Sequence, residues 1–207
     1  MNQEERRIYL IRELQREMPQ YQHIEIPAGE TEQWQLLRSL FNVRPPYPAN
    51  ADFLRIQDEY LTEMNARGGI TDARSLVPTK ADSRIYLWQG DITTLRCDAI
   101  VNAANSALLG CWYPLHSCID NMIHSRSGIQ LRLCCNALMK AQGHEEPAGQ
   151  AKITPAYNLP GKYILHTVGP IIRGRVTGKD RELLASCPVY QEIYYSQFPK
   201  EGVSSEG

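Results

Sequence analysis

Two cysteines and a histidine lie close together in the stretch GCWYPLHSC, residues 110–118. Cys111, His116 and Cys118 supply two thiolates and an imidazole, which are good zinc ligands. On a helix, His116 and Cys118 would point about 200° apart, so they converge on one ion only if the segment is a loop. Pro114 favours a loop, and the three side chains are therefore candidate metal ligands.

Three ligands indicate a particular kind of site. A structural zinc site has four protein ligands, whereas a catalytic site keeps one position open for water or substrate, so this cluster favours catalysis. The alternative is that both cysteines are small buried apolar residues and that His116 caps the next helix. Cys97, Cys134 and Cys135 lie among apolar residues and are expected to be core.

Asp91, Asn102 and Asn105 form a second candidate group, in GDIT and VNAAN. Asp91 follows an expected strand, where it can accept a hydrogen bond from an exocyclic amine. Asn102 and Asn105 lie at the exit of the next strand, where ligands bind to open α/β sheets, and two amides there can grip ribose hydroxyls. The alternative is that all three are turn and cap residues.

A third candidate site is the helix start at CIDN, residues 118–121. The N–H groups of Ile119, Asp120 and Asn121 would be unpaired in its first turn, and such a terminus binds phosphate well. Ordinary helix capping explains the same residues without a ligand.

The elements that position these residues are helices followed by alternating strands and helices. Residues 1–80 predict three amphipathic helices, with Thr31 and either Asn50 or Asp52 as N-caps and Gly68-Gly69 as a stop. These helices are expected to pack on the rest, because three short helices bury little surface alone. The later elements that the sequence predicts are strands within 84–93, 97–105, 151–160 and 162–170, and helices within 118–128 and 129–143. Apolar strands suggest a sheet covered on both faces, hence α/β.

Composition excludes several classes of protein. The 207 residues carry a formal net charge of −1 without a basic block, so a large nucleic-acid footprint is not expected. No apolar run approaches the roughly 20 residues that span a bilayer, and the N-terminus does not resemble a signal peptide. We therefore expect a cytoplasmic protein that binds neither nucleic acid nor membrane. The six cysteines then indicate core, metal or catalytic thiols rather than disulfides.

GDIT, DAIVNAAN and AKITPAYNLPGKYILHTVGP, in that order and with those gaps, resemble the macrodomain, an ADP-ribose-binding module. Most macrodomains follow VNAAN with a glycine-rich stretch, whereas this chain has the zinc-ligand residues there. It is similar in this respect to the zinc-dependent protein-ADP-ribose hydrolases of microbes, which also carry an N-terminal helical extension. The resemblance implies a macrodomain-like mixed sheet with helices on both faces (81–187), an N-terminal helical extension (1–80) and a divergent tail (188–207).

The resemblance also implies roles for individual residues. Asp91 with the Ile92 amide would hold adenine, and Asn102 and Asn105 would contact ribose, with Asn105 near the scissile bond. The implied zinc ligands are Cys111, His116 and Cys118, and the residues implied to line the diphosphate and ribose are Cys118, Ile119, Asp120 and Asn121. Asn105 and Asp120 are the implied catalytic residues, with Asp120 orienting an attacking water.

The implied activity is zinc-dependent removal of ADP-ribose from mono-ADP-ribosylated protein side chains, with a link to a sirtuin-type ADP-ribosyltransferase. The alternatives are a module that binds ADP-ribose without cleaving it, a structural zinc knuckle, or an inactive truncated form. The last arises because relatives continue past DRELLASC with a buried strand and a phosphate loop. This chain instead has Pro188 and PVYQEIYYSQFPKEGVSSEG, which predicts weak activity at best.

Overall fold

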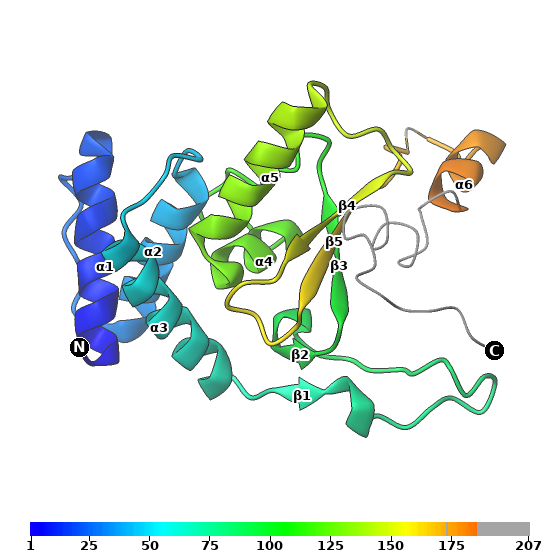
Figure 1. Cartoon of the computed structure of the whole chain (residues 1–207), viewed down its shortest axis with the longest axis horizontal. Helices are drawn as coiled ribbons and strands as arrows, with labels where there is room; N and C mark the ends of the chain where they lie inside the picture. The colour runs from blue at the N-terminus through cyan, green and yellow to red at the C-terminus, as the bar shows by residue number, and fades with distance from the viewer. Residues whose placement is uncertain (173, 186–207) are drawn as a thin grey trace, which may run out of the picture.

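The computed structural model describes residues 1–172 and 174–185. Figure 1 shows a layer of three N-terminal helices beside a small sheet that carries its own helices. The N-terminal layer consists of α1 (Gln3–Glu17), η1 (Pro19–Tyr21), α2 (Glu30–Val43) and α3 (Ala51–Arg67). The later elements are β1 (Thr71–Asp72), η2 (Ala73–Ser75), η3 (Ile92–Thr94), β2 (Leu95–Arg96), β3 (Ala99–Ala104), α4 (Ile119–Ser127), α5 (Ile129–Gln142), β4 (Ala151–Pro155), β5 (Tyr163–Val168) and α6 (Gly178–Ala185).

The N-terminal helices begin and end largely where the sequence predicts. The side chain of Asn50 accepts a hydrogen bond from the Phe53 N–H at 2.7 Å and so caps α3, and Gly68 is the C-cap of this helix. Thr31 does not cap α2, because that helix already begins at Glu30, with Gly29 as its N-cap. Glycine is an accepted N-cap because it adopts the required extended backbone freely.

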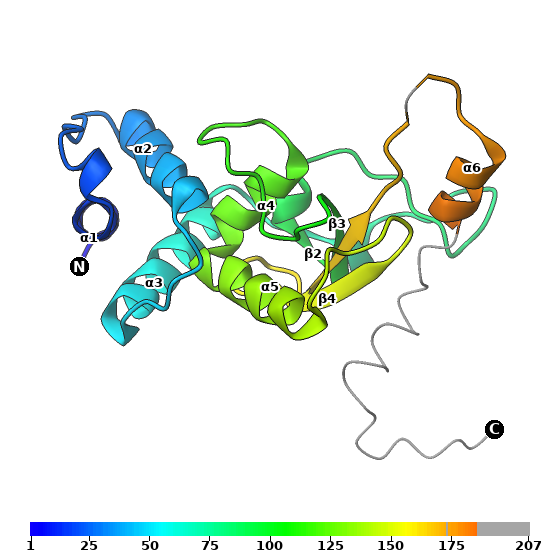
Figure 2. The ribbon, with the colours of Figure 1, turned by 90° about the horizontal axis from the view of Figure 1, so that it is seen from above.

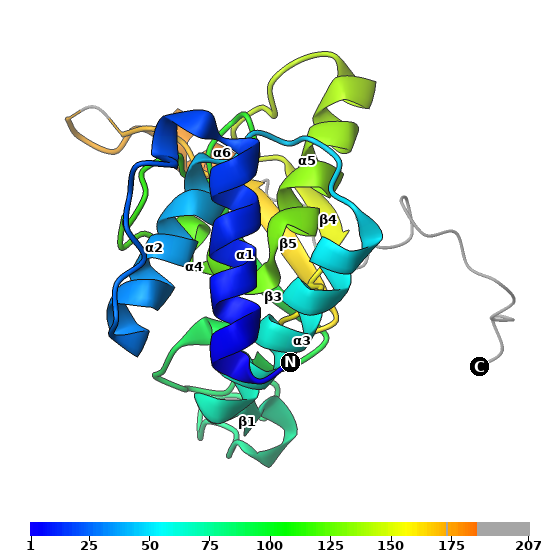
Figure 3. The same cartoon turned by 90° about the vertical axis from the view of Figure 1, so that its left-hand side faces the viewer.

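The three helices share one apolar core, and they also pack on the rest of the chain as expected. Figure 3 shows α1 in front of α2 and α3, which separate it from the sheet and from α4 and α5. The core residues are Leu10, Ile11, Leu14, Met18, Leu37, Leu40, Phe41, Phe53, Ile56, Tyr60 and Leu61, together with Ile129 of α5. The buried Arg132 of α5 joins the two parts, because its Nη1 donates to the carbonyls of Phe41, Asn42 and Arg44.

The sheet has the strand order β3-β5-β4. β3 lies parallel to β5, with Asn102 opposite His166, and β4 lies antiparallel on the other side of β5. The predicted strands within 97–105, 151–160 and 162–170 are therefore confirmed. So are the two predicted helices within 118–143, and the C-cap of α5 is Gly143, which has a left-handed φ of 78°.

Alternate residues of the sheet face α4 and α5, which lie on the same side of the strands in Figures 1 and 2. Ile100 and Ile164 pack there against Ile123 and Leu131. The sequence predicts helices over both faces, but Val101, on the opposite face, is 52% exposed. In the described ranges, β3 is thus apolar on both faces but buried on one.

The predicted strand within 84–93 is wrong for the described structure. Residues 84–89 form no ladder, apart from an isolated bridge between Pro78 and Tyr86, and Leu87 is 88% exposed. A strand persists only when a neighbouring strand takes up its backbone hydrogen bonds, and residues 1–172 and 174–185 provide no such ladder here. β-branched and aromatic residues alone do not make a strand.

The predicted divergent tail, residues 188–207, lies outside the described residues. The expectations about a missing strand and phosphate loop fall on that part of the chain. Among the helices that the structure describes, none is long and apolar enough to cross a membrane.

Candidate functional site

Cys111, His116 and Cys118 converge, as the loop hypothesis requires. Each offers one ligand atom, and these atoms all lie within 4.8 Å of one another. The segment before α4 contains no helix, so the two residues that would diverge on a helix can approach each other. His116 is exposed and both thiols are half-buried. The cluster therefore opens toward solvent on one side.

Gly110 fixes the start of this loop against α4. Its φ of 77° lies in the left-handed region, and a Cβ there would lie 2.9 Å from the ring of the buried His124. The carbonyl of Gly110 also accepts a hydrogen bond from Asn105 Nδ2 at 3.1 Å. Only glycine combines this backbone conformation with so close an approach, so Gly110 places Cys111 next to the end of β3.

Cys118 is both a candidate ligand and the N-cap of α4. Its Sγ accepts a hydrogen bond from the Asn121 N–H at 3.4 Å, so His116 does not cap this helix. Burial, more than any other cause, raises the pKa of the Cys118 thiol. Of the N–H groups expected to be free for phosphate at this helix start, that of Asn121 is therefore already engaged.

The carboxylate of Asp120 lies at the buried start of α4 and faces two asparagines, one within β3 and one just after it. Asn102 Nδ2 donates to Asp120 Oδ1 at 2.8 Å, and Asn105 Nδ2 lies 3.4 Å from Oδ2. Burial raises the pKa of Asp120, while the Asn102 hydrogen bond and the charge of Arg132 lower it. Asp120 is thus a desolvated carboxylate beside a candidate metal ligand.

Asn102 does not lie where the sequence predicts. It is inside β3 and fully buried, so the structure does not support its predicted contact with ribose. Strand alternation points its side chain at α4 with that of Ile100, and the parallel register sets it opposite His166. The buried Asn102 therefore holds the Asp120 carboxylate from the strand side, whereas the exposed Asn105 lies beside the loop.

His124, Cys135 and His166 form a second group whose ligand atoms all lie within 4.8 Å of one another, but all three are buried. His166 Nδ1 lies 3.1 Å from Asn102 Nδ2 and its Nε2 lies 2.9 Å from Thr154 Oγ1. Burial lowers the pKa of both histidines, so each is neutral at pH 7. The expectation that Cys135 belongs to the core fits this packing, and the buried His166 is held in the same way.

Acid is expected to destabilise the fold through His166. Burial lowers the pKa of His166 to about 4, from 6.5 for an exposed imidazole. The unfolded chain takes up a proton below pH 6.5 that the folded chain refuses until about pH 4, so the free energy of unfolding falls as the pH drops through that window. Between pH 7 and pH 5 we expect a loss of about 2 kcal/mol from this group, measured by urea denaturation at both pH values.

The matched variant for this measurement is His166→Gln, which keeps a polar side chain but does not titrate. Its stability at pH 7 will be lower, and its loss on acidification should shrink by about the amount assigned to His166. An equally steep pH dependence in the variant would contradict the assignment.

Asp91 lies in a surface cavity of 430 Å³ at the other end of α4. Its Oδ1 accepts hydrogen bonds from the Thr93 N–H and hydroxyl, at 2.9 and 2.6 Å, and so caps the short helix that begins at Ile92. Its Oδ2 remains 3.7 Å from Arg126 Nη2. Trp88 also lines this cavity, which is a suitable environment for a flat heterocycle.

The two parts of the candidate site are joined by α4. Cys118 precedes its first residue and Arg126 is in its last turn, so they are roughly 12 Å apart along the helix axis. The predicted adenine end and the ligand cluster thus lie at opposite ends of one short helix, a separation suited to an extended nucleotide sugar.

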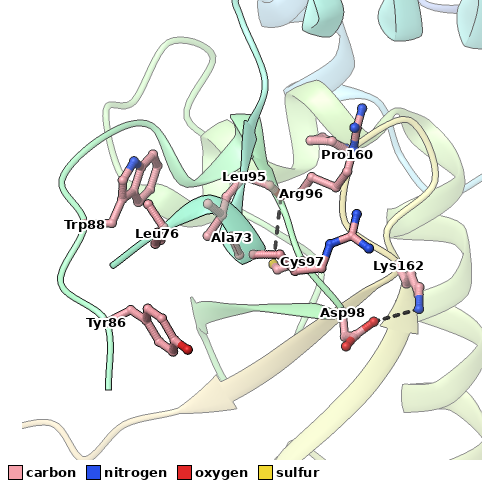
Figure 4. A pocket seen from close by; sticks show the side chains of 11 residues that line it. Ala73, Leu76, Tyr86, Trp88, Leu95, Arg96, Cys97, Asp98, Pro160 and Lys162 are labelled. Atoms are coloured by element: carbon pink, nitrogen blue, oxygen red, sulfur yellow. Dashed lines mark hydrogen bonds and ion pairs between the residues drawn. The ribbon is translucent and has the colours of Figure 1, made fainter. Parts of the chain in front are cut away.

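Trp88 also lines a second, larger cavity of 890 Å³. Figure 4 shows Leu76, Tyr86 and Trp88 around it, with Cys97 and the Asp98–Lys162 ion pair along one wall. Its ion pair is closed at 2.7 Å, and none of the candidate metal ligands lines it. The chemistry that the sequence singled out therefore lies outside this cavity.

Comparison with known proteins bears directly on this arrangement. The macro domain family profile matches residues 101–192, which include the end of β3, the ligand cluster and α4. A Treponema medium protein, named protein-ADP-ribose hydrolase, is 57% identical over 188 residues, 90% of this chain and 72% of that protein. This chain belongs to the macrodomain family.

Other macrodomain relatives are similar over less of their length. A Staphylococcus aureus protein-ADP-ribose hydrolase is 48% identical over 86% of this chain and 67% of its own. The structure of an Oceanobacillus iheyensis macrodomain with ADP has 39% identity and a TM-score of 0.42. It covers 47% of this chain, and the chain spans half the length of that protein.

The sequence of this macrodomain did not reveal several side chains that lie outside the motifs but contact the residues of the site. Asn121 is fully buried and its amide oxygen accepts from Arg38 and Asn42 of α2, so the structure does not support its side chain as a diphosphate ligand. Arg126 faces Asp91 from α4. No motif marks either arginine, because each acts through a contact distant in sequence.

Proposed function

We propose that this macrodomain is a zinc-dependent hydrolase that removes ADP-ribose from mono-ADP-ribosylated protein side chains. The single observation that carries the proposal is the convergence of Cys111, His116 and Cys118 directly beside Asp120 and Asn105. The names of the Treponema and Staphylococcus relatives support the reaction, and the donor set supports the metal.

The ligand cluster fits zinc. Bond lengths of about 2.3 Å to sulfur and 2.0 Å to nitrogen in a tetrahedron place ligand atoms roughly 3.3–3.8 Å apart. The three atoms lie within 4.8 Å of one another, so a small contraction of the loop suffices. Two thiolates and an imidazole are soft and borderline ligands, which favour zinc over magnesium or calcium.

In this proposal Cys111, His116 and Cys118 would hold the ion. Bound zinc would supply Lewis-acid polarisation and a bound water whose pKa falls toward about 7. Asp120 orients the attacking water and accepts its proton. Asn102 keeps the carboxylate aimed, and Asn105 contacts the distal ribose near the scissile bond.

We assign the adenine and the diphosphate of ADP-ribose to positions along α4. Asp91, through its Oδ2, and the Ile92 amide take the adenine in the cavity beside Trp88. The backbone of Cys118, Ile119 and Asp120 at the helix start faces the diphosphate, where the helix dipole favours negative charge. A sirtuin-type ADP-ribosyltransferase as the source of the modified protein stays a prediction.

Release of ADP-ribose from a mono-ADP-ribosylated protein tests the proposal. We expect release by the purified chain, its loss after a chelator, and its return with zinc but not with magnesium. Release that a chelator leaves unchanged would refute the metal assignment. Binding of ADP-ribose without release would establish the alternative of a non-catalytic binding module, and a full-length relative assayed in parallel would show whether this chain is weakly active.

A further inference from the structure

The ligand loop, residues 106–118, is held by side chains from other elements rather than by its own backbone. The candidate metal ligands lie in residues 111–118 of this loop. Within that part, one backbone hydrogen bond is present, from the His116 N–H to the Tyr113 carbonyl, and it is 3.4 Å long. Its carbonyls instead accept from surrounding side chains: Leu109 from Arg132 at 2.7 Å, Gly110 from Asn105 at 3.1 Å, Tyr113 from Asn121 at 2.6 Å, Pro114 from Asn42 at 3.3 Å and His116 from Arg38 at 2.5 Å. The last two donors belong to α2, in the N-terminal layer.

Arg38 makes the most direct of these contacts with a ligand residue. Its Nη2 donates both to the His116 carbonyl and to Asn121 Oδ1, the latter at 2.7 Å, and its Nε donates to the same Oδ1 at 3.1 Å. The N–H of Asn121 is capped by Cys118. One planar guanidinium therefore links the backbone of one ligand to the helix turn that carries another, and such charge-assisted bonds are among the stronger ones in proteins.

Asn42, one helix turn beyond Arg38, extends this contact. It is buried, and its Nδ2 lies 3.1 Å from Asn121 Oδ1 and 2.8 Å from Ser125 Oγ. Spacing of four residues places Arg38 and Asn42 on the same face of α2. This face is aligned with α4 and the loop, so the N-terminal layer forms one wall of the ligand site.

We propose that Arg38 is a positioning residue that holds the ligand loop in a preformed arrangement, so that the N-terminal helices set the metal affinity of the site. The effect on metal affinity rests on the proposed zinc hydrolase function. The role of Arg38 in holding the loop does not. A preformed site binds more tightly because less ordering accompanies binding.

The test compares Arg38→Met, Arg38→Lys and Arg55→Met. Methionine keeps an unbranched side chain without hydrogen-bond donors, and lysine keeps the charge but not the planar, two-pronged guanidinium. The control, Arg55, is a 58%-exposed arginine of α3 in the same helical layer. In the zinc-free proteins, hydrogen exchange of amides 106–118 should be about tenfold faster or more in Arg38→Met. It should be intermediate in Arg38→Lys and unchanged in Arg55→Met.

Two further readouts separate positioning from a general structural role. Zinc affinity, measured by competition with a chromophoric chelator, should fall about 10- to 100-fold in Arg38→Met, while the urea midpoint of global unfolding stays near that of Arg55→Met. Loop exchange at the parent rate in Arg38→Met, or equal losses in exchange and global stability, would overturn the proposal. Failure of the parent chain to bind zinc would instead overturn the proposed function, and the exchange measurement would still decide the role of Arg38.

Discussion

Replacing Cys118 by serine is expected to lower ADP-ribose release by at least about a hundredfold and to remove the zinc. Mutation of a residue that hydrogen-bonds to a metal ligand lowers metal affinity or activity about 10- to 100-fold, and loss of the ligand itself should lower them at least as much. Serine is the informative choice because Cys118 also caps α4 through the Asn121 N–H. A serine hydroxyl is a good N-cap but a poor zinc ligand, so the helix is kept while the thiolate is lost.

The matched control is Cys134→Ser, at a half-exposed cysteine of α5 outside the ligand cluster. It should keep both the zinc content, measured by atomic absorption, and the rate of release. Circular dichroism of Cys118→Ser should match the parent chain. A Cys118→Ser protein that releases ADP-ribose at the parent rate would contradict the assignment of this cluster to the reaction.

The second large effect is expected from Asp120→Asn, which should slow release by about 10²- to 10³-fold with zinc retained. The amide has the shape of the carboxylate and can still accept the hydrogen bond from Asn102, which measures 2.8 Å in the structure. It cannot accept a proton from water. The expected loss is therefore confined to the turnover rate, with ADP-ribose affinity and the unfolding midpoint little changed.

Asp98→Asn is the control for this change, because Asp98 is an exposed carboxylate paired with Lys162. Single-turnover release of ADP-ribose from a modified protein, with each enzyme in excess, measures the chemical step directly. If Asp120→Asn matches Asp98→Asn in this assay, the proton acceptor must be another group.

The sequence was sufficient for the features that depend on neighbouring residues. A cap at Asn50 or Asp52, Gly143 as a helix end and the break in helix between Cys111 and Cys118 follow from local backbone preferences. The strands around VNAAN and YILHTV follow from apolar patterning, and the order of the motifs predicted the family. Each of these features could be predicted because the residues that determine it lie within a few positions of each other.

The tertiary structure decided what the side chains touch. Asn102 was predicted as a ribose ligand, but strand register turns it onto Asp120 and His166. The strand predicted within 84–93 fails because pairing depends on a partner strand, which its own residues do not encode. Arg38 reaches a loop 78 positions away, and no local pattern marks it, since distance in space is set by how helices and sheet pack and not by spacing along the chain.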